Sequence, residues 1–311
     1  MRDDDSRPTV VIARDILELG AGGRIPTTVH YQNTLGIGSG TVQKALRELK
    51  EAGAVSLVAR GHQGTFIEEL DLAALWSAAR LSPLHILLTP SSPPEVTGLA
   101  SAIAKRLSAL GVTTTAGFAA GARARAEALL RGDADATLMS AGAADAITST
   151  LGTRNFHRVD FPGASYYAPG SLTMVTRSDG PQPPRRVAID EGSEDHSRLT
   201  RAAFAAQHVQ YVPYPFTTVP RSVLLGDVDA GIWHQVDTLI PLDAVGLDVT
   251  ELAIPSDPGL VKRISGAVLL TRPSGPIAAL FSEFDAVNVR QQGQPGARSA
   301  QGTVGMPLRL S

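Results

Sequence analysis

The chain has 311 residues, a formal net charge of −2, an isoelectric point near 6.4, and 43% hydrophobic and 19% charged residues. This is an ordinary globular composition, and the length predicts two or three domains. Because cysteine is absent, disulfide bonds, thiolate catalysis and cysteine-ligated zinc are excluded. The N-terminus is acidic and polar, and no apolar run approaches the roughly 18 residues of a membrane span. We therefore expect a cytoplasmic protein without membrane contact.

Residues 24–53 predict two helices joined by a glycine turn. Thr27 or Thr28 can cap a short first helix, Gly36 can end it in a left-handed conformation, and Ser39 can cap the second. The second helix has an apolar face at helical spacing, formed by Val42, Ala45, Leu46 and Leu49. Polar residues in its first turn and on its opposite face are typical of a helix that lies in a major groove of DNA.

A β-hairpin is predicted directly after this second helix. Residues 54–59 and 64–68 are apolar strands, and Arg60, Gly61, His62 and Gln63 join them. Two glycines around a basic, hydrogen-bonding tip describe a wing that can approach a DNA backbone closely. A small helical domain with a solvated charged face is the alternative, but the order of turn, helix and wing favours a winged helix-turn-helix.

The same segment resembles the winged helix of the GntR type. Ile25-Pro26-Thr27 and then Leu35-Gly36-Ile37-Gly38-Ser39-Gly40-Thr41-Val42 follow that family's pattern in the same register. The resemblance implies that Ser39, Thr41 and Gln43 face DNA, with His62 and Gly64 at the wing. Val29 and Ser39 stand where the family usually has arginines, so a base preference is not implied. The full set expected to contact DNA is Thr27, Thr28, Ser39, Thr41, Gln43, Lys44, Arg47, Arg60, His62, Gln63 and Gly64.

The charge of this segment is small for a DNA-binding module. Between Arg24 and Phe66, five basic residues stand against two acidic ones, a net charge of +3 with histidine neutral. Since affinity grows with the number of phosphates neutralised, we expect weak binding per protomer. Tight binding to double-stranded DNA would need a homodimer on two half-sites.

A linker helix is predicted over residues 71–82. Asp71 can cap it, and Leu72, Leu75, Trp76 and Ala79 recur at helical spacing. The helix could pack the DNA-binding module on the domain that follows, or form a dimer contact. The first interpretation is favoured, because most apolar stripes of this kind are core.

From residue 84 onward, strands and helices alternate. Strands are predicted at 84–88, 112–117 and 134–140, and helices at 94–110 and 123–131. Alternation at this spacing indicates βαβ units and a mainly parallel sheet.

An internal similarity indicates that this α/β region has two lobes. Residues 126–145 and 221–237 each contain a helix ending in Leu-Leu, a Gly-Asp turn and an Asp-Ala that opens an apolar strand. Residues 171–176 and 264–271 are expected to cross between the lobes, and a last helix runs from 276 to about 289. The predicted division is a winged helix-turn-helix at 8–70, a linker helix at 71–83, a two-lobed domain at 84–289 and a disordered tail at 290–311. Lobe 1 is expected at about 84–178 plus 265–289, and lobe 2 at about 185–263.

The two-lobed region resembles the type II periplasmic-binding-protein fold. With the GntR-like module in front, residues 10–288 are similar to the YhfZ family, most specifically at the helix-turn-helix and at Gly226-Asp227-Val228-Asp229-Ala230-Gly231-Ile232-Trp233. The resemblance implies a multidomain α+β and α/β protein, a winged helix-turn-helix followed by a two-lobed α/β binding domain. It does not imply a particular ligand.

The ligand of such sheets lies outside the carboxyl ends of the strands, between the lobes. Residues at the predicted strand ends are Thr89, Ser91, Ser92, Ser140, Asp190, Ser193, Thr217, Thr218, Trp233 and His234. Hydroxyls, an aromatic face, an imidazole and a carboxylate suit a small polar or zwitterionic effector. Each residue also has a structural interpretation: Ser91 and Ser92 can cap a helix, and Trp233 is more often core.

No pattern predicts catalysis, a metal or a cofactor. The histidines lack metal-ligand spacing, and neither a nucleophile elbow nor a Walker-type loop is present. Asp195 and His196 are adjacent, and neighbouring residues on a helix point apart. The acidic pairs Asp133 with Asp135 and Asp227 with Asp229 are interpreted as turn and strand-start residues. The sequence therefore predicts a non-enzymatic transcriptional regulator; the alternative is a solute-binding or enzymatic two-lobed protein whose winged helix serves protein contacts.

Overall fold

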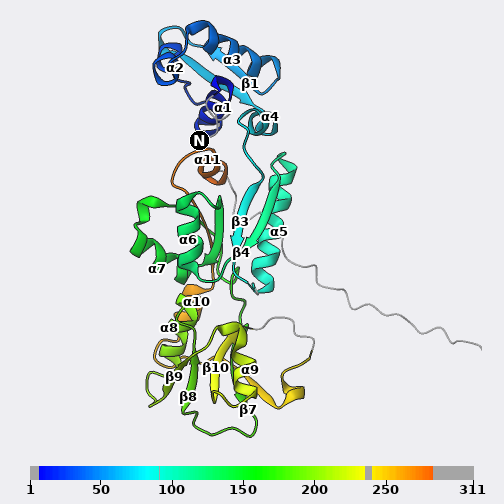
Figure 1. Cartoon of the computed structure of the whole chain (residues 1–311), viewed down its shortest axis with the longest axis vertical. Helices are drawn as coiled ribbons and strands as arrows, with labels where there is room; N and C mark the ends of the chain where they lie inside the picture. Colours follow the sequence, from blue (N-terminus) through cyan, green and yellow to red (C-terminus); the bar gives the residue numbers. More distant parts are fainter. Residues whose placement is uncertain (1–6, 91, 235–239, 283–311) are drawn as a thin grey trace, which may run out of the picture.

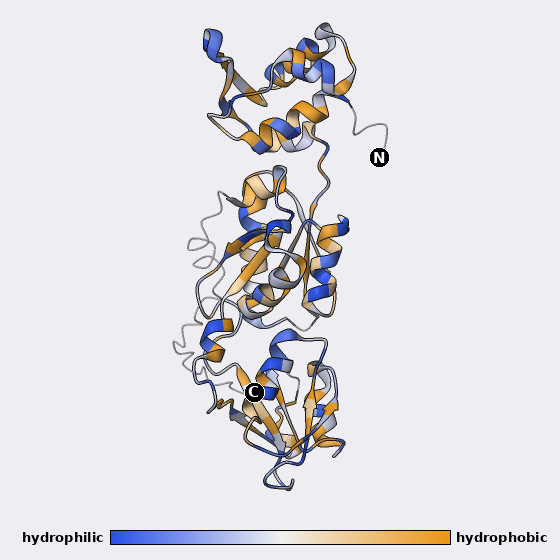
Figure 2. Ribbon diagram, turned by 90° about the vertical axis from the view of Figure 1, so that its left-hand side faces the viewer, coloured by the Kyte–Doolittle hydropathy of each residue, from blue (hydrophilic) through white to orange (hydrophobic). Residues whose placement is uncertain are grey.

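The computed structural model describes residues 7–90, 92–234 and 240–282. These residues form three tiers along one long axis, a small helical module followed by two α/β lobes (Figure 1). The strands of both lobes carry mostly hydrophobic residues, as expected for sheets covered by helices (Figure 2). Ser91, the end of the last predicted helix and the predicted tail at 290–311 lie outside the described residues.

The first tier is a helix-turn-helix with a hairpin. Its elements are α1 (Pro8–Leu19), α2 (Thr28–Leu35), α3 (Ser39–Glu51), β1 (Val55–Ala59), the short 3-10 helix η2 (Gly61–Gln63), β2 (Thr65–Leu70) and α4 (Leu72–Ala78). The Thr27 side chain accepts the His30 N–H and caps α2, and Gly36 ends it with φ of 65°. The prediction that Ser39 caps α3 is wrong: Gly38 is the cap residue and Ser39 is already helical. Glycine before a Ser-Gly-Thr run adopts the extended cap conformation without needing a side-chain acceptor.

The helix α1, which the sequence analysis did not single out, joins the first tier to the second. Pro8 occupies its first turn, where proline loses no helical hydrogen bond. Its buried side chains Ile12 and Ile16 belong to the largest apolar cluster, and α1 contacts α3, α4 and α11. The helix α4 is capped by Asp71 as predicted, and Leu75 and Trp76 are buried. The linker helix therefore packs as core.

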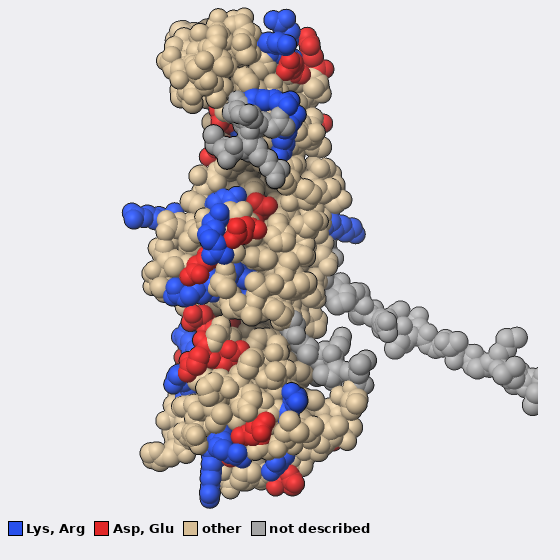
Figure 3. Space-filling view, in the orientation of Figure 1, with Lys and Arg blue, Asp and Glu red and all other residues tan. Residues whose placement is uncertain are grey.

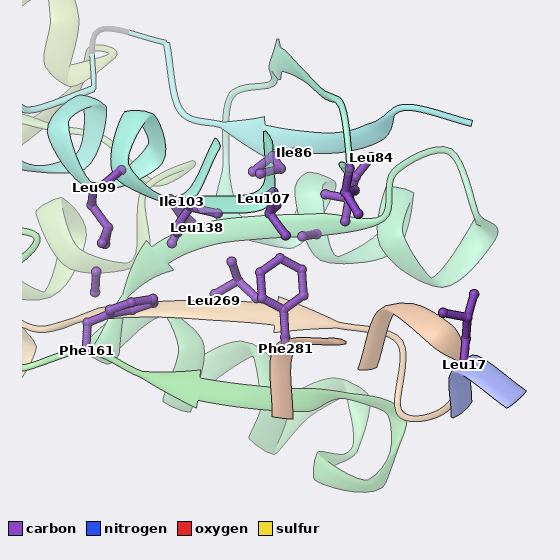
Figure 4. Packing of buried hydrophobic residues seen from close by; sticks show 14 of the residues in the cluster. Leu17, Leu84, Ile86, Leu99, Ile103, Leu107, Leu138, Phe161, Leu269 and Phe281 are labelled. Atoms are coloured by element: carbon purple, nitrogen blue, oxygen red, sulfur yellow. The ribbon is translucent and has the colours of Figure 1, made fainter. Parts of the chain in front are cut away.

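Lobe 1 contains a five-stranded sheet with the order β4-β3-β5-β12-β6. Its elements are β3 (Leu84–Leu88), α5 (Pro94–Ala109), β4 (Thr114–Phe118), α6 (Ala122–Arg131), β5 (Ala136–Ser140), α7 (Ala141–Leu151), the 3-10 helix η3 (Thr153–Asn155), β6 (His157–Asp160), β12 (Ala267–Thr271) and α11 (Pro276–Ser282). Figure 4 shows how Ile103 and Leu107 of α5 meet strand residues such as Leu138, and how Phe281 of α11 closes the core. The predicted alternation is confirmed here.

Lobe 2 contains a second five-stranded sheet, with the order β11-β7-β10-β8-β9. Its elements are β7 (Leu172–Arg177), β8 (Arg186–Ile189), α8 (Glu194–Ala203), β9 (Gln210–Pro213), the 3-10 helix η4 (Phe216–Thr218), α9 (Val219–Leu224), β10 (Ala230–His234), the 3-10 helix η5 (Asp243–Val245), β11 (Leu247–Glu251) and α10 (Leu260–Ile264). The expected position of β7 in lobe 1 is corrected: it pairs antiparallel with β10 and β11. A short apolar strand fits either sheet, so its sequence does not decide which one it joins.

The internal similarity corresponds to the same contact in both lobes. Asp135 accepts the His85 N–H at 2.9 Å, and Asp229 accepts the Arg185 and Arg186 N–H groups at 3.0 and 2.9 Å. In each lobe, the aspartate before one strand ties it to the start of its parallel neighbour. The Asp-Ala motif is therefore structural, as the sequence predicted.

Candidate functional site

The second helix of the helix-turn-helix exposes a polar face. In α3, Val42, Ala45 and Leu49 are buried, whereas the side chains predicted to contact DNA are exposed: Ser39, Thr41, Gln43, Lys44 and Arg47. The apolar stripe holds the helix on the module, so the opposite face is free to enter a groove. Of the two preceding threonines, Thr27 is exposed and Thr28 is half-buried.

Two basic side chains, Arg60 and Arg24, lie at the tip of the wing. Arg60, His62 and Gln63 are exposed, and the Arg60 guanidinium lies 4.7 Å from the centre of the Phe66 ring. Arg24 forms an isolated bridge with Phe66, and its side chain lies against Gly64. Sequence reasoning omitted Arg24 from the DNA set because it precedes the first helix of the motif. The pairing of residue 24 with the hairpin is a tertiary contact.

The charge distribution of the molecule is mixed. On the face shown in Figure 3, basic and acidic side chains alternate along all three tiers instead of gathering on one. The net charge of +3 between Arg24 and Phe66 comes from Arg24, from Arg60 and from a single net positive charge on α3. Among the described residues, no helix is long and apolar enough to cross a membrane.

A cavity of about 390 Å³ lies between the two lobes. It is bounded in lobe 1 by the segments after β3, β4 and β5, and in lobe 2 by those after β8, β9 and β10. Six of the residues chosen from strand ends line it: Thr89, Ser140, Asp190, Ser193, Thr217 and His234. The volume is within the range of small-molecule sites, about 300 to 1,000 Å³.

Three of the predicted ligand residues do not line this cavity. The Ser92 hydroxyl donates to the Thr89 carbonyl, and the Thr218 hydroxyl donates to the Pro215 carbonyl, so both stabilise turns. Trp233 belongs to the core of lobe 2 and borders a separate hollow of about 970 Å³. Successive residues of a strand face opposite sides of the sheet, which is why His234 reaches the cavity and Trp233 does not.

Several polar groups of the cavity already hold the structure together. Asp190 accepts the Gly192 and Phe216 N–H groups, each at 2.9 Å, so both of its carboxylate oxygens are engaged. Ser140 caps α7 by accepting the Ala143 N–H at 3.0 Å, and Ser193 caps α8. These three side chains therefore stabilise the segments that form the cavity wall.

Among the lining residues that sequence reasoning missed, seven have charged or aromatic side chains: Arg125, Tyr166, Tyr167, Glu194, Asp195, His196 and Phe216. His196 stacks on Phe216 with ring centres 4.5 Å apart, and His234 lies 4.7 Å from the same ring. Asp195 and His196 are both buried and both line the cavity. As expected for neighbours on a helix, their contacts differ: Asp195 accepts the Tyr167 hydroxyl, whereas His196 packs on Phe216.

The buried position of these groups changes their protonation. Burial raises the pKa of Asp195 to about 6, although hydrogen bonds from Ser140 and Tyr167 oppose the shift. Burial, together with His234, lowers the pKa of His196 to about 3, with the Ile232 carbonyl acting weakly against it. Burial also lowers the pKa of Arg125 and raises that of Tyr166 to about 12. His196 and Tyr166 are therefore neutral at physiological pH.

Among the described residues, no group of three histidine or acidic side chains is arranged to hold a metal ion. The cavity offers hydroxyls, aromatic faces, two imidazoles, one guanidinium and three carboxyl groups. These groups can bind and orient a small polar molecule.

The sequence of residues 71–291 matches the family profile described as the YhfZ C-terminal domain. The chain belongs to the YhfZ family. Residues 20–67 match a helix-turn-helix domain profile. The YhfZ protein of Escherichia coli strain K12 is 27% identical over 261 residues, which cover 84% of this chain and 83% of that protein.

A solved structure of a YhfZ protein shares the fold of this chain. The crystal structure of YhfZ from Shigella flexneri has a TM-score of 0.54 and 24% identity, covering 72% of this chain and 93% of that chain. The periplasmic aliphatic sulphonate binding protein SsuA from Escherichia coli has a TM-score of 0.45 and 18% identity, covering 68% of this chain and 72% of that chain. The predicted fold class and family are confirmed. A helix-turn-helix joined to a binding-protein-like domain fits a DNA-binding regulator.

Proposed function

We propose that this protein is a transcriptional regulator that binds operator DNA through α3 and the wing, and that senses a small polar effector in the interlobe cavity. The observation that carries the proposal is the face of α3, where Thr41, Gln43, Lys44 and Arg47 are exposed beside the hairpin. If this face of α3 were buried, the helix could not enter a groove of DNA. The second half of the proposal rests on the cavity, which both lobes line.

The contact between the first tier and lobe 1 supports coupling of the two sites. The helix α1 contacts both α3 and α11, and the Gly275 N–H donates to Glu18 Oε1 at 3.1 Å. A change in lobe geometry can therefore reach α3 through one helix. An effector that binds one conformation tenfold more tightly shifts the equilibrium by about 1.4 kcal/mol, enough to change operator occupancy.

A homodimer is part of the proposal. The small positive charge of the first tier allows only a few contacts with DNA phosphates. A dimer on two half-sites would double the number of these contacts. Effector binding would then change the spacing or angle of the two α3 helices. The GntR-like register suggests a similar mode of docking.

The test is fluorescence anisotropy with labelled fragments of the gene's own upstream DNA and unrelated DNA, over a series of salt concentrations. We expect Gln43→Ala and Lys44→Ala to weaken binding to the upstream fragment by roughly 5- to 150-fold, as loss of a groove contact of about 1–3 kcal/mol implies. Lys44→Ala should also reduce the salt slope by about 0.9 if Lys44 contacts a phosphate.

The matched controls are Gln207→Ala and Lys105→Ala, which remove the same side chains from exposed positions in lobe 2 and on α5. Their DNA affinity should equal that of the unmodified protein. Equal, weak binding of the unmodified protein to both DNAs would contradict the regulator proposal. It would leave the two-lobed domain as the functional part and favour a solute-binding or enzymatic role.

A further inference from the structure

We propose that the ligand of the interlobe cavity is a small organic anion whose charged group is bound by Arg125. The proposal rests on the effector site described above and names the chemical class of its ligand. It depends on the contacts of one buried guanidinium and on how the carboxylates around it are engaged.

Arg125 is almost completely buried, with 3% of its surface exposed, and it lines the cavity. Its Nε donates to Thr137 Oγ1 at 3.3 Å and its Nη1 donates to the Ala119 carbonyl at 2.9 Å. Both acceptors are neutral, and within the described part of the chain no ion pair involves Arg125. A guanidinium stays charged in proteins, and buried charges are otherwise paired. The missing counter-charge is therefore expected from the ligand.

The neighbouring helix end favours the same sign of charge. Arg125 lies in the first turn of α6, a helix of 10 residues that starts after Gly121 and has no side-chain cap. Gly121, Ala122 and Arg125 all line the cavity. Uncapped N–H groups at a helix start attract an anion, and here they lie beside the unpaired guanidinium.

The acidic residues of the cavity do not compete for the same role. Both oxygens of Asp190 already accept backbone N–H groups. Asp195 Oδ2 accepts the Tyr167 hydroxyl at 3.1 Å. Asp190 and Asp195 are thus supplied with donors, and Glu194, the third acidic residue that lines the cavity, is exposed to solvent. The charge of Asp195 acts on Arg125 through space, but the guanidinium has no ion-pair partner among the described residues. This asymmetry favours an anionic ligand over a cationic one.

The wall in lobe 2 suits an unsaturated or apolar body. Phe216 and the two imidazoles of His196 and His234 form one aromatic cluster. Among the described residues, neither ring nitrogen of His196 has a hydrogen-bond partner at normal geometry, although the side chain is only 2% exposed and the Ile232 carbonyl lies close enough to favour its protonated form. A neutral imidazole can donate to or accept from a polar atom of the ligand. The inferred ligand has an anionic end at α6 and a flat body at this wall.

The experiment compares three probes of one shape, benzoate, benzamide and benzylamine, by calorimetric titration and by the melting temperature of the full chain. Succinate and inorganic phosphate extend the set of anions. We expect anions to bind and to raise the melting temperature, and the neutral and cationic probes to do neither. Arg125→Gln should weaken anion binding roughly 30-fold or more, because it removes the charged partner of a buried pair.

Arg123→Gln is the matched control, since Arg123 lies on the same helix, is exposed and, within the described ranges, forms an ion pair with Glu127 at 3.7 Å. It should bind the anions as the unmodified protein does. Arg125→Lys retains the charge without the planar fork and should recover part of the affinity, which separates a charge effect from misfolding. If no anion binds, if anions bind Arg125→Gln equally well, or if benzylamine binds best, the proposal is overturned.

Measuring DNA affinity with and without the bound probe separates this proposal from the regulator proposal. An anion that binds through Arg125 but leaves DNA affinity unchanged supports the ligand class and contradicts sensing by the regulator. A shift of DNA affinity by benzylamine alone supports the regulator and contradicts the ligand class.

Discussion

Asp195 is a buried carboxyl group at the junction of the lobes. It belongs to α8 of lobe 2, accepts a hydrogen bond from Tyr167, and lies against Gly142 at the start of α7 in lobe 1. Burial raises its pKa from 3.8 to about 6. The protonated form is thus favoured by folding. Its contribution to stability is fully present below pH 3.8 and is lost as the pH rises to about 6.

Asp195→Asn should therefore stabilise the protein in a pH-dependent way. The amide keeps an acceptor for Tyr167 and cannot ionise. We expect the melting temperature of the variant to equal that of the unmodified protein near pH 4 and to exceed it increasingly up to about pH 6, with a limit of about 3 kcal/mol at 1.36 kcal/mol per pKa unit. Scanning calorimetry across this range measures the difference.

The variant must be compared with the unmodified protein at each pH, because His196 titrates in the opposite sense. Its pKa is lowered from 6.5 to about 3, so its contribution is present above pH 6.5 and is lost as the pH falls toward 3. Both proteins share this effect, and it cancels in the difference. A difference that does not change with pH would contradict the assignment of a raised pKa to Asp195.

At the scale of the element, the wing depends on a glycine conformation. Gly64 has φ of 102°, and a Cβ there would lie 2.6 Å from Arg24 Nε. Gly61, at the other end of the tip, has φ of 56° and nothing within 4 Å of its Cβ position. The two glycines share backbone strain on substitution, but only Gly64 adds a steric contact with a basic side chain.

We expect Gly64→Ala to lower DNA affinity more than Gly61→Ala does. The backbone strain costs about 1–2 kcal/mol for Gly61→Ala. It costs up to about 3 kcal/mol for Gly64→Ala, because Gly64 has ψ of −162° and lies in a region that essentially only glycine adopts. Gly64→Ala additionally displaces Arg24. The melting temperature of the whole protein should change little, since the hairpin tip is exposed. Anisotropy titrations of both variants measure the effect. Equal affinities would show that the position of Arg24 does not matter for DNA binding.

At the scale of the whole molecule, the lobes meet tightly at one point. A Cβ on Gly142 of α7 would lie 2.5 Å from Ile264 Cγ2 and 2.6 Å from Asp195 Oδ1. Ile264 ends α10, which leads back to lobe 1, and Asp195 belongs to lobe 2. A methyl group at this position would hold the two lobes apart.

Gly142→Ala should therefore open the cavity and weaken ligand binding, although alanine is the better helix former by about 1 kcal/mol. We expect a larger radius of gyration by small-angle X-ray scattering and weaker binding of the anionic probes. Gly163→Ala is the control, because its nearest contact would be Ser265 Oγ at an ordinary 3.6 Å. An unchanged radius of gyration in Gly142→Ala would contradict the closed contact as the determinant of lobe spacing.

Contacts between residues close in sequence were predicted more successfully than contacts between distant residues. The stripe of Val42, Ala45 and Leu49 and the cap at Thr27 depend on neighbours in sequence, and both were confirmed. The burial of Arg125 could have been predicted, because Arg125 stands at helical spacing from the apolar residues Ala122 and Leu129, which are buried. An arginine on an apolar face is a signal of a buried, paired charge, and it was overlooked.

The sequence by itself determined the helix-turn-helix and the alternation of strands and helices, because periodicity and capping act over a few residues. Only the tertiary structure decided that β7 joins the second sheet, that Arg24 supports the wing, and that Arg125 faces His196 across one cavity. These contacts join residues far apart in the chain. No local pattern specifies which distant surface a side chain will meet, and in this protein the ligand site is built from such contacts.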